Sequence, residues 1–369
     1  MKKFVLVAIG GTGMRVAQSV VALAAAGFLS DLCESEYKLE IRLVDLDVVP
    51  GSDKIELEEM IRAVNDAMGH LSIEIGKHPE DKRWRAKGID GMQTLQVPID
   101  DRSTLNDLLH DGFLPGSEAL AYHALFSEDD RTLVLCRGCK GRPRIGSLLW
   151  AEQFDLDWTN PGGFWRSIFG DIVEDELRVM FAGSVFGGTG ASGTPTLAQK
   201  FIEACLRGDR GNTAAYASHV ALTLMLPYFN VGQDTDVDSG LFSINSKMAL
   251  KYYETSDALR GVEFTQFVGD DRQNMEKKDQ QGVWNSVRLD RNSSTQEGQN
   301  DPSMPAELMA AIGICRYFAG DVPKADAVPH KVYVPLKWSN TNPELDIAPE
   351  DAFPLLSFDY FPVTSEGQD

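Results

Sequence analysis

The stretch from Gly187 to Gly193 reads GGTGASG and holds four glycines among seven residues. Phosphate groups are bound by closely spaced backbone N–H donors, and glycine lets the main chain approach them because it has no Cβ. A plain connection has no need of so many glycines, since each costs conformational entropy on folding. The hydroxyls of Thr189 and Ser192 add hydrogen-bond donors. The pattern therefore predicts a phosphate-binding loop, and the alternative is a purely structural loop.

A weaker candidate lies near the N-terminus, where Gly10-Gly11-Thr12-Gly13 follows an apolar run. A helix that begins in such a loop offers unpaired N–H groups and the positive end of its dipole to a phosphate. Taken alone, this loop also fits a tight strand-to-helix turn. Neither loop is a P-loop, because no GKS or GKT occurs in the chain. A dinucleotide fingerprint would need its third glycine at Val16, so that motif is not matched either.

The five cysteines suggest no further chemistry. Cys136 and Cys139 form a CxxC pair, but no second pair or histidine cluster completes a four-ligand zinc site. We expect reduced cysteines that pack in the core.

Both glycine loops follow apolar runs typical of strands that are buried on both faces, at residues 4–9 and 177–184. Further strands are predicted at 41–46, 132–136, 219–226, 262–268 and 331–336. Helices are predicted after each glycine loop and at 145–154, 245–259 and 305–318, and unplaced helices within 51–111. The polar residues 270–302 predict an exposed insertion or a mobile loop.

Alternating strands and helices predict an α/β fold with a parallel sheet and right-handed crossovers. Ligands bind such sheets at the carboxyl ends of the strands. The glycine loops lie at those ends, so we expect them to converge on one site.

Composition narrows the class of protein. The 369 residues carry a formal net charge of −20, which argues against direct binding to nucleic acid or an anionic membrane. The apolar run at 16–29 is too short to span a bilayer and no signal peptide is recognised, so we expect a cytoplasmic protein.

Taken together, these motifs resemble the tubulin and FtsZ superfamily. The family's signature loop reads GGGTG followed by small residues, and here Phe186 replaces the leading glycine. The other matching segments follow in the family's order: IGGTG at 9–13, DLD at 45–47, GRPRIGSLLWAE at 141–152, LTLMLPYFN at 222–230 and FTQFVGDD at 264–271. SVFGGTGASG, GRPRIG and the DPSMPAEL segment at 301–308 are most similar to the bacterial tubulin-like proteins.

The resemblance implies a tubulin/FtsZ-type nucleotide-binding domain at residues 1–320, including a core helix, that binds GTP or GDP with Mg²⁺. Residues 321–369 would form a short C-terminal extension or the start of a reduced or truncated second domain. The implied cofactor-binding residues are Gly10, Gly11, Thr12, Gly13, Asp45, Asp47, Gly141, Pro143, Gly187, Gly188, Thr189, Gly190, Ser192, Asn245, Asp270 and Asn300.

Their implied roles differ. The first loop would hold the α- and β-phosphates and the second the β- and γ-phosphates. Asp45 or Asp47 would lie near the metal or the ribose, with Asp47 as the metal ligand. Asn245, Asp270, Asp271 and Asn300 are candidates for the edge of the base, and each fits a loop or helix-cap role equally well.

In tubulins an acidic loop after the core helix completes the nucleotide site of a neighbouring subunit. The corresponding stretch here reads AGDVPKAD, which does not match the family's NxDxxD pattern but supplies Asp321 and Asp326 as candidate catalytic acids. The resemblance thus implies a self-associating GTPase that forms head-to-tail filaments, with a further partner protein left open. The motif mismatch leaves catalysis and polymerisation as open questions.

Three alternatives remain at this stage. A non-catalytic, nucleotide-sensing scaffold would bind nucleotide without turnover. An ATP-dependent adenylating enzyme of the ubiquitin-activating type also begins with a strand, a glycine loop and a helix, and its second strand ends much as LVDLDVV does at 43–49. That class has no role for the 187–193 loop. A nicotinamide-dependent oxidoreductase would need a catalytic acid–base pair, and none stands out.

Overall fold

The computed structural model describes most of the chain. The described residues are 2–46, 52–75, 86–95, 97, 99–100, 102–109, 115–139, 141–169, 176–208, 213–228, 230–231, 240–270, 286–287, 305–321 and 330–336.

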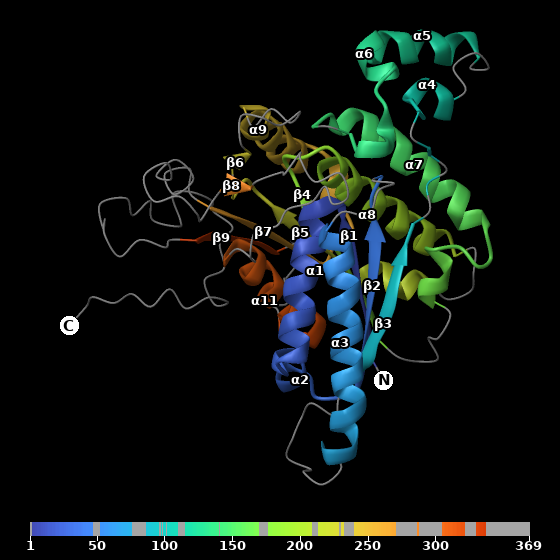
Figure 1. The fold of residues 1–369 in the computed structure, drawn as a ribbon. Helices are drawn as coiled ribbons and strands as arrows, with labels where there is room; N and C mark the ends of the chain where they lie inside the picture. The colour runs from blue at the N-terminus through green and yellow to red at the C-terminus, as the bar shows by residue number, and fades with distance from the viewer. Residues whose placement is uncertain are drawn as a thin grey trace, which may run out of the picture.

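A parallel sheet of seven strands forms the centre of the molecule, in the order β3-β2-β1-β4-β5-β7-β9 (Figure 1). Its strands are β1 (Lys2–Ile9), β2 (Tyr37–Val44), β3 (Ala86–Thr94), β4 (Leu177–Ser184), β5 (Val220–Met225), β7 (Phe264–Asp270) and β9 (His330–Leu336). Two short strands, β6 (Asn230–Val231) and β8 (Ser286–Val287), pair separately. The predicted α/β class with a parallel sheet is confirmed.

The strand order reverses between β1 and β4. From β1 the chain proceeds outward through β2 and β3, and it then returns to place β4 on the other side of β1, with Ala8 opposite Ala182. From β4 it proceeds outward through β5, β7 and β9. Such a reversal opens a crevice at the carboxyl ends of the two central strands.

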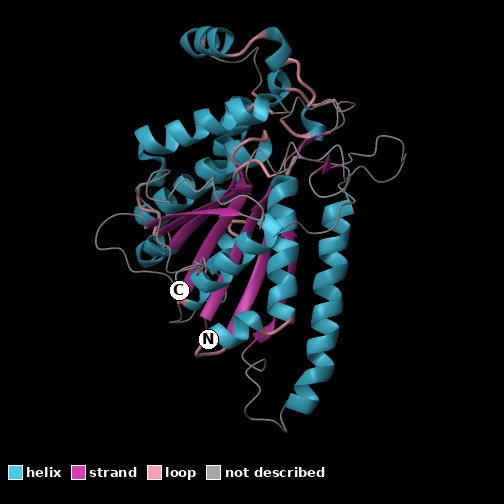
Figure 2. Ribbon diagram, turned by 90° about the vertical axis from the view of Figure 1, so that its left-hand side faces the viewer, coloured by secondary structure: helices cyan, strands magenta, loops and turns pink. Residues whose placement is uncertain are grey.

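Helices cover both faces of the sheet (Figure 2). On one face, Phe4, Leu6 and Ala8 of β1 share a core with α1 (Gly10–Ala25), α2 (Phe28–Leu32), α3 (Ser52–Ile75) and α11 (Pro305–Ala319). On the other face, the alternate residues of β1 pack with α7 (Pro143–Thr159) and α8 (Thr189–Arg207). Because successive side chains of a strand point to opposite faces, β1 is apolar at nearly every position.

The connection from β3 to α7 forms a protrusion beyond the carboxyl edge of the sheet (Figure 1). It contains α4 (Leu105–Leu108), α5 (Gly116–Leu125) and α6 (Glu128–Arg131), followed by a 3-10 turn at Leu135–Arg137. A small core that includes Leu105, Tyr122, Phe126, Leu135 and Ile145 holds it together. We call the described part of residues 102–137 the protrusion.

The remaining described elements are one helix, α9 (Gly240–Thr255), and the 3-10 turns Arg166–Phe169, Thr213–His219 and Asp257–Leu259. Among the helices that the structure describes, none combines the length and the apolar character that a bilayer span requires.

One strand prediction was wrong, and one strand of the seven-stranded sheet was missed. Residues 132–136 do not join the sheet: Thr132 ends α6, and Leu135 is buried in the core of the protrusion. The missed strand is β3, AKGIDGMQT, which contains two glycines and only one buried apolar residue that the structure describes, Ile89. Most of the predicted insertion at 270–302 lies outside the described residues.

Candidate functional site

The two glycine loops meet at the crevice between β1 and β4. Helix α1 begins at Gly10, directly after β1, and α8 begins at Thr189, with four residues between it and the end of β4. A Cβ on Gly10 would lie 3.4 Å from the Thr189 Cβ and 3.5 Å from the Gly190 nitrogen. Gly10 has φ +68°, a conformation that favours glycine. The two helix N-termini, each with unpaired N–H groups, therefore converge on one place.

A third loop, which contains Gly138, Cys139, Gly141 and Arg142, lies directly on the second. A Cβ on Gly138 would be 3.3 Å from the Thr189 hydroxyl oxygen. Asn245 of α9 joins the two loops, because its side-chain nitrogen donates to the Gly141 carbonyl at 3.1 Å and to the Phe186 carbonyl at 2.9 Å. These two bonds use both N–H donors of the Asn245 side chain. Its side-chain carbonyl oxygen could therefore only accept a hydrogen bond from a nucleotide base.

Several loop glycines are required by protein packing. A Cβ on Gly188 would lie 2.8 Å from the Cys139 Cβ and 3.0 Å from the Gly141 nitrogen. A Cβ on Gly190 would lie 2.7 Å from the Ser184 nitrogen, and one on Gly13 would lie 2.6 Å from the Ala182 carbonyl oxygen. These glycines let the loops and strands approach one another, a reason that the sequence pattern did not reveal.

The accessible part of the site is correspondingly small. Gly11 is exposed, and Thr12, Gly187 and Thr189 are partly exposed. Ser192 is fully buried, and its hydroxyl donates to the Gly188 carbonyl at 2.7 Å within α8. The structure therefore gives Ser192 a packing role and leaves the other four residues at the mouth of the crevice.

A carboxylate from β2 borders the site. Asp45 follows β2 and accepts a hydrogen bond from the Leu46 nitrogen at 2.7 Å. Burial, with a contribution from the nearby charge of Asp45, raises the pKa of the Cys139 thiol to about 12. Cys139 is thus an inert, packed thiol, and no disulfide is formed by Cys33, Cys136, Cys139, Cys205 or Cys315. Within the described residues no group of three or more metal-ligating side chains occurs.

A buried ionic network connects the first glycine loop to α11. Nε of Arg15, in α1, lies 2.5 Å from Glu307 Oε1, and both side chains are almost completely buried. The Tyr228 hydroxyl also donates to Glu307 Oε1 at 2.8 Å, and it is hydrogen-bonded to Thr12. Burial, together with the Glu307 charge, raises the pKa of Tyr228 well above its ordinary value. Sequence reasoning missed this network, because 292 residues separate Arg15 and Glu307.

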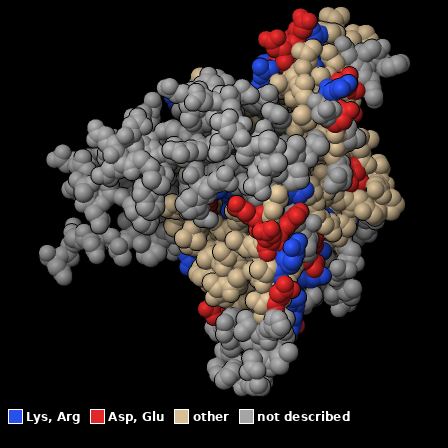
Figure 3. Space-filling model, in the orientation of Figure 1, with Lys and Arg blue, Asp and Glu red and all other residues tan. Residues whose placement is uncertain are grey.

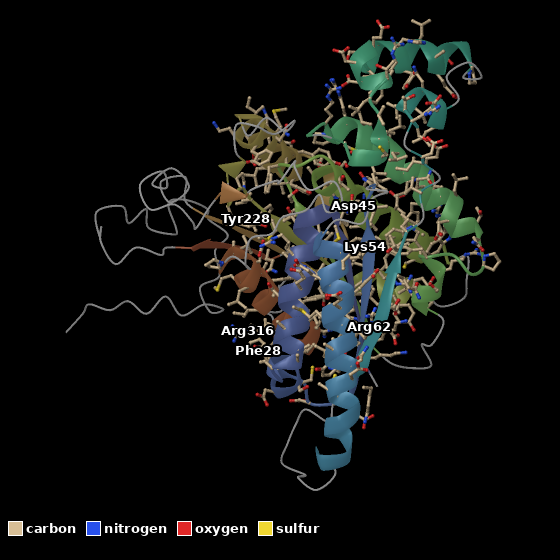
Figure 4. All side chains as sticks on the ribbon, in the orientation of Figure 1. Phe28, Asp45, Lys54, Arg62, Tyr228 and Arg316 are labelled. Atoms are coloured by element: carbon tan, nitrogen blue, oxygen red, sulfur yellow. The ribbon has the colours of Figure 1, made fainter. Side chains whose placement is uncertain are left out.

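The opposite end of α11 lies at the amino edge of the sheet. Arg178, the second residue of β4, donates to the Tyr317 carbonyl near the end of the helix, and Gly320 at φ +83° ends it. Asp321 follows, about half exposed, in an ion pair of 2.9 Å with Arg316. Figure 4 shows Asp45 and Tyr228 near the start of α1 and Arg316 toward the other end. Asp321 therefore lies far from the glycine loops of its own chain.

Other predicted residues are placed only in part. Pro143 is the first residue of α7, next to the third loop. Asp270 is the last residue of β7, at the carboxyl edge. Asp47, Asp271, Asn300 and Asp326 lie outside the described residues.

The comparisons with known proteins give structural matches alone. No family model and no curated protein matches the chain. Among solved structures, CetZ2 from Haloferax volcanii, as a GTPγS-bound protofilament, is 12% identical with a TM-score of 0.37, covering 88% of this chain and 60% of that one. The GDP-bound monomer of CetZ1 from the same organism is 12% identical with a TM-score of 0.35, covering 72% and 51%.

A further match is an FtsZ mutant from M. jannaschii, 13% identical with a TM-score of 0.31, covering 72% of this chain and 46% of that one. The chain thus spans about half to three fifths of the length of these structures. We base the proposal below on the chain's own strand order and loops.

Proposed function

We propose that this chain is a tubulin-like GTP-binding protein that self-associates and hydrolyses GTP at a site completed by a neighbouring subunit. The observation that carries the proposal is the meeting of two glycine-containing helix N-termini at the point where the strand order reverses. Parallel α/β sheets bind ligands at this place, and helix N-termini bind phosphate. The sequence motifs supply the tubulin-like part, and similarity to the bacterial tubulin-like proteins stays a prediction.

The residues at the site fit a nucleotide with Mg²⁺. Gly11, Thr12, Gly187 and Thr189 would donate to the phosphates. Mg²⁺ is usually bound by only one or two protein carboxylates, and phosphate and water oxygens complete its coordination. A single carboxylate from the segment after β2, that of Asp45 or Asp47, would therefore be enough to hold the metal. Bound there, the metal would neutralise charge on the phosphates. We further propose that the protein works in the cytoplasm.

The position of Asp321 supports the shared site. It lies at the amino edge of the sheet, whereas the glycine loops lie at the carboxyl edge. If subunits stack head to tail, the amino edge of one meets the carboxyl edge of the next, and such heterologous contacts generate filaments. Asp321 or Asp326 would then orient the attacking water of the neighbouring site.

Nucleotide choice is the first test. We expect calorimetry with Mg²⁺ to show tighter binding of GTP than of ATP. Equal or tighter binding of ATP would remove the assignment of guanine and leave the phosphate site standing. Release of pyrophosphate from ATP would instead support an adenylating enzyme.

Concentration dependence is the second test. We expect GTP turnover per subunit to rise with protein concentration, and Asp321→Ala or Asp326→Ala to reduce it while GTP affinity is kept. Asp31→Ala is a matched control, because Asp31 is also an exposed acid, on α2. A specific rate that stays flat, or full turnover in both variants, would contradict the shared site. Binding without turnover would leave a nucleotide-sensing scaffold.

A further inference from the structure

Helix α5 of the protrusion carries an apolar stripe on its outer side. Tyr122 and Phe126 bury the inner side of the helix in the small core of the protrusion. Leu120 and Leu125 are 74% and 67% exposed. At about 100° per residue, the mean direction of the two leucines lies roughly opposite that of the two buried aromatic rings. The helix therefore presents two large apolar side chains to the solvent.

Helix α9 carries a second apolar stripe with regular spacing. Ile244, Met248 and Tyr252 follow one another at intervals of four residues and are 57%, 62% and 49% exposed. Residues four apart lie on one face of a helix, so the three side chains form a row. The other side of α9 packs inward through Phe242 and Tyr253. Single exposed apolar side chains are ordinary, whereas a contiguous row marks an interaction surface.

The stripe on α5 lies in an acidic stretch of the protrusion. Residues 103–130 contain six acidic residues and no lysine or arginine. Glu118 precedes Leu125 by two helical turns and so lies on the same side of α5, and Glu128 and Asp129 begin α6. These three acidic side chains are exposed, and none forms an ion pair with a residue that the structure describes. Their carboxylates are therefore available to a partner.

The row on α9 has a basic border. Lys247 and Lys251 are both exposed, and each is next in sequence to a member of the row. Neither forms an ion pair within the described part of the chain. Glu254 is the one acidic residue of α9. The row on α9 therefore matches the stripe on α5 in apolar character and is opposite to it in charge.

The two helices lie apart in a single chain. Figure 1 shows α5 in the protrusion and α9 on the other side of the molecule, both toward the carboxyl edge of the sheet. The stripe on α5 therefore does not cover the row on α9 of its own chain. Both halves of a complementary contact are thus present in one sequence, which identifies a second copy of this chain as the partner.

We infer that α5 of one copy packs against α9 of a second copy. The leucines of α5 bury the row on α9, and the three unpaired carboxylates of the protrusion face Lys247 and Lys251. Apolar burial supplies most of the affinity, and the opposite charges determine which surface each stripe accepts. The contact uses neither the glycine loops nor Asp321. It is therefore separate from the head-to-tail contact proposed above and does not require a bound nucleotide.

Complementation between two variants of the nucleotide-free chain tests this contact. Leu120→Ser removes an apolar side chain from α5 and Met248→Ser removes one from α9. Because both positions are mostly exposed, we expect both variants to fold, which far-UV circular dichroism checks. Sedimentation velocity over a range of protein concentrations should show each variant alone associating about tenfold more weakly than the wild-type chain.

An equimolar mixture of the two variants should regain association. The intact α5 of the Met248→Ser chain can pack on the intact α9 of the Leu120→Ser chain, and neither variant alone has such a pair. Leu206→Ser is the control, because Leu206 of α8 is also 62% exposed and belongs to neither stripe, so association should not change. The double variant Lys247→Glu/Lys251→Glu should behave as Met248→Ser does, alone and in the mixture.

Several results would overturn the inference. A wild-type chain that stays monomeric at every concentration has no such contact. Full association of either serine variant, or of the double lysine variant, would show that its helix does not take part. A mixture that associates no better than its components would exclude a contact between α5 of one copy and α9 of another. Because nucleotide is absent throughout, none of these results bears on GTP binding, which calorimetry tests separately.

Discussion

At the scale of single residues, Gly190 tests whether the second loop needs glycine for packing. A Cβ there would lie 2.7 Å from the Ser184 nitrogen and 3.1 Å from the Ser184 carbonyl oxygen, both backbone atoms. We predict that Gly190→Ala lowers the free energy of unfolding by about 1–3 kcal/mol, measured by urea denaturation.

Gly162→Ala is the matched control for this substitution. A Cβ on Gly162 would meet nothing within 4 Å, so we expect a change within about 0.5 kcal/mol. If Gly190→Ala keeps full stability and loses only nucleotide binding, the glycine is needed by the phosphate and not by Ser184.

Glu307 is the second residue for which the surroundings predict how a substitution changes the stability of the fold. Its carboxylate is completely buried between Arg15 and Tyr228. Glu307→Gln removes the negative charge that pairs with the buried Arg15 guanidinium, so we predict a loss of about 3–5 kcal/mol in the free energy of unfolding. Glu118→Gln, at an exposed position on α5, should have almost no effect. Equal stability of the two variants would show that the Arg15 charge is compensated elsewhere.

At the scale of elements, α11 is held to the sheet by a polar contact at its centre. Gln266 of β7 donates to the Thr223 hydroxyl at 2.8 Å and to the Ala310 carbonyl at 2.9 Å. Its amide oxygen occupies the space that a Cβ on Gly313 would need. The helix can therefore approach the sheet only with glycine at that position.

A double-mutant cycle measures this contact. We predict that Gly313→Ala destabilises the wild-type chain more than the Gln266→Ala variant, with a coupling energy of about 0.5–3 kcal/mol. The readout is the urea midpoint with an unchanged slope. Additive effects would mean that the two positions do not constrain each other.

Three of the strands that the sequence predicted correctly share one property. β1, β4 and β5 are buried on both faces and read as continuous apolar runs, which local pattern identifies. β3 lies at the edge of the sheet and has mixed polarity, so its sequence carries no such run. The run TLVLC is apolar for another reason, because Leu133 and Leu135 pack within the protrusion. A short apolar run does not say which core it joins.

For the candidate site, too, the sequence predicted the features that have a local signal and missed the contacts between distant residues. Glycine loops carry a local signal, and the parallel sheet places them at one edge, so their convergence follows from the sequence. Pairings such as Asp130 with Arg144, or Arg15 with Glu307, depend on contacts across 14 and 292 residues. Charged residues at such separations are common in any chain, so the pattern gives no sign of which pairs will meet.

At the scale of the whole molecule, net charge sets an expectation for self-association. A chain of formal charge −20 repels its own copies. On the face shown in Figure 3, side chains of both signs lie over α3 and over the protrusion. Salt screens the net repulsion over about 10 Å at 0.1 M ionic strength.

We therefore predict that association of the nucleotide-loaded protein strengthens as ionic strength rises from about 0.02 to 0.3 M. Sedimentation velocity at matched protein concentrations measures it, with the nucleotide-free chain as control. Association that weakens with salt would show that attractive charge pairs between subunits outweigh the net repulsion.

The packing of Trp150 gives the molecule an optical property. Its indole is fully buried in α7, and its nitrogen lies 3.2 Å from the position that a Cβ on Gly193 would take, at the end of the second glycine loop. That indole N–H has no hydrogen-bond partner among the described residues. Because indole emission responds to nearby charge and polarity, nucleotide binding can be followed by the chain's own fluorescence, without an attached dye. A Trp150→Phe variant would identify how much of the signal comes from this position.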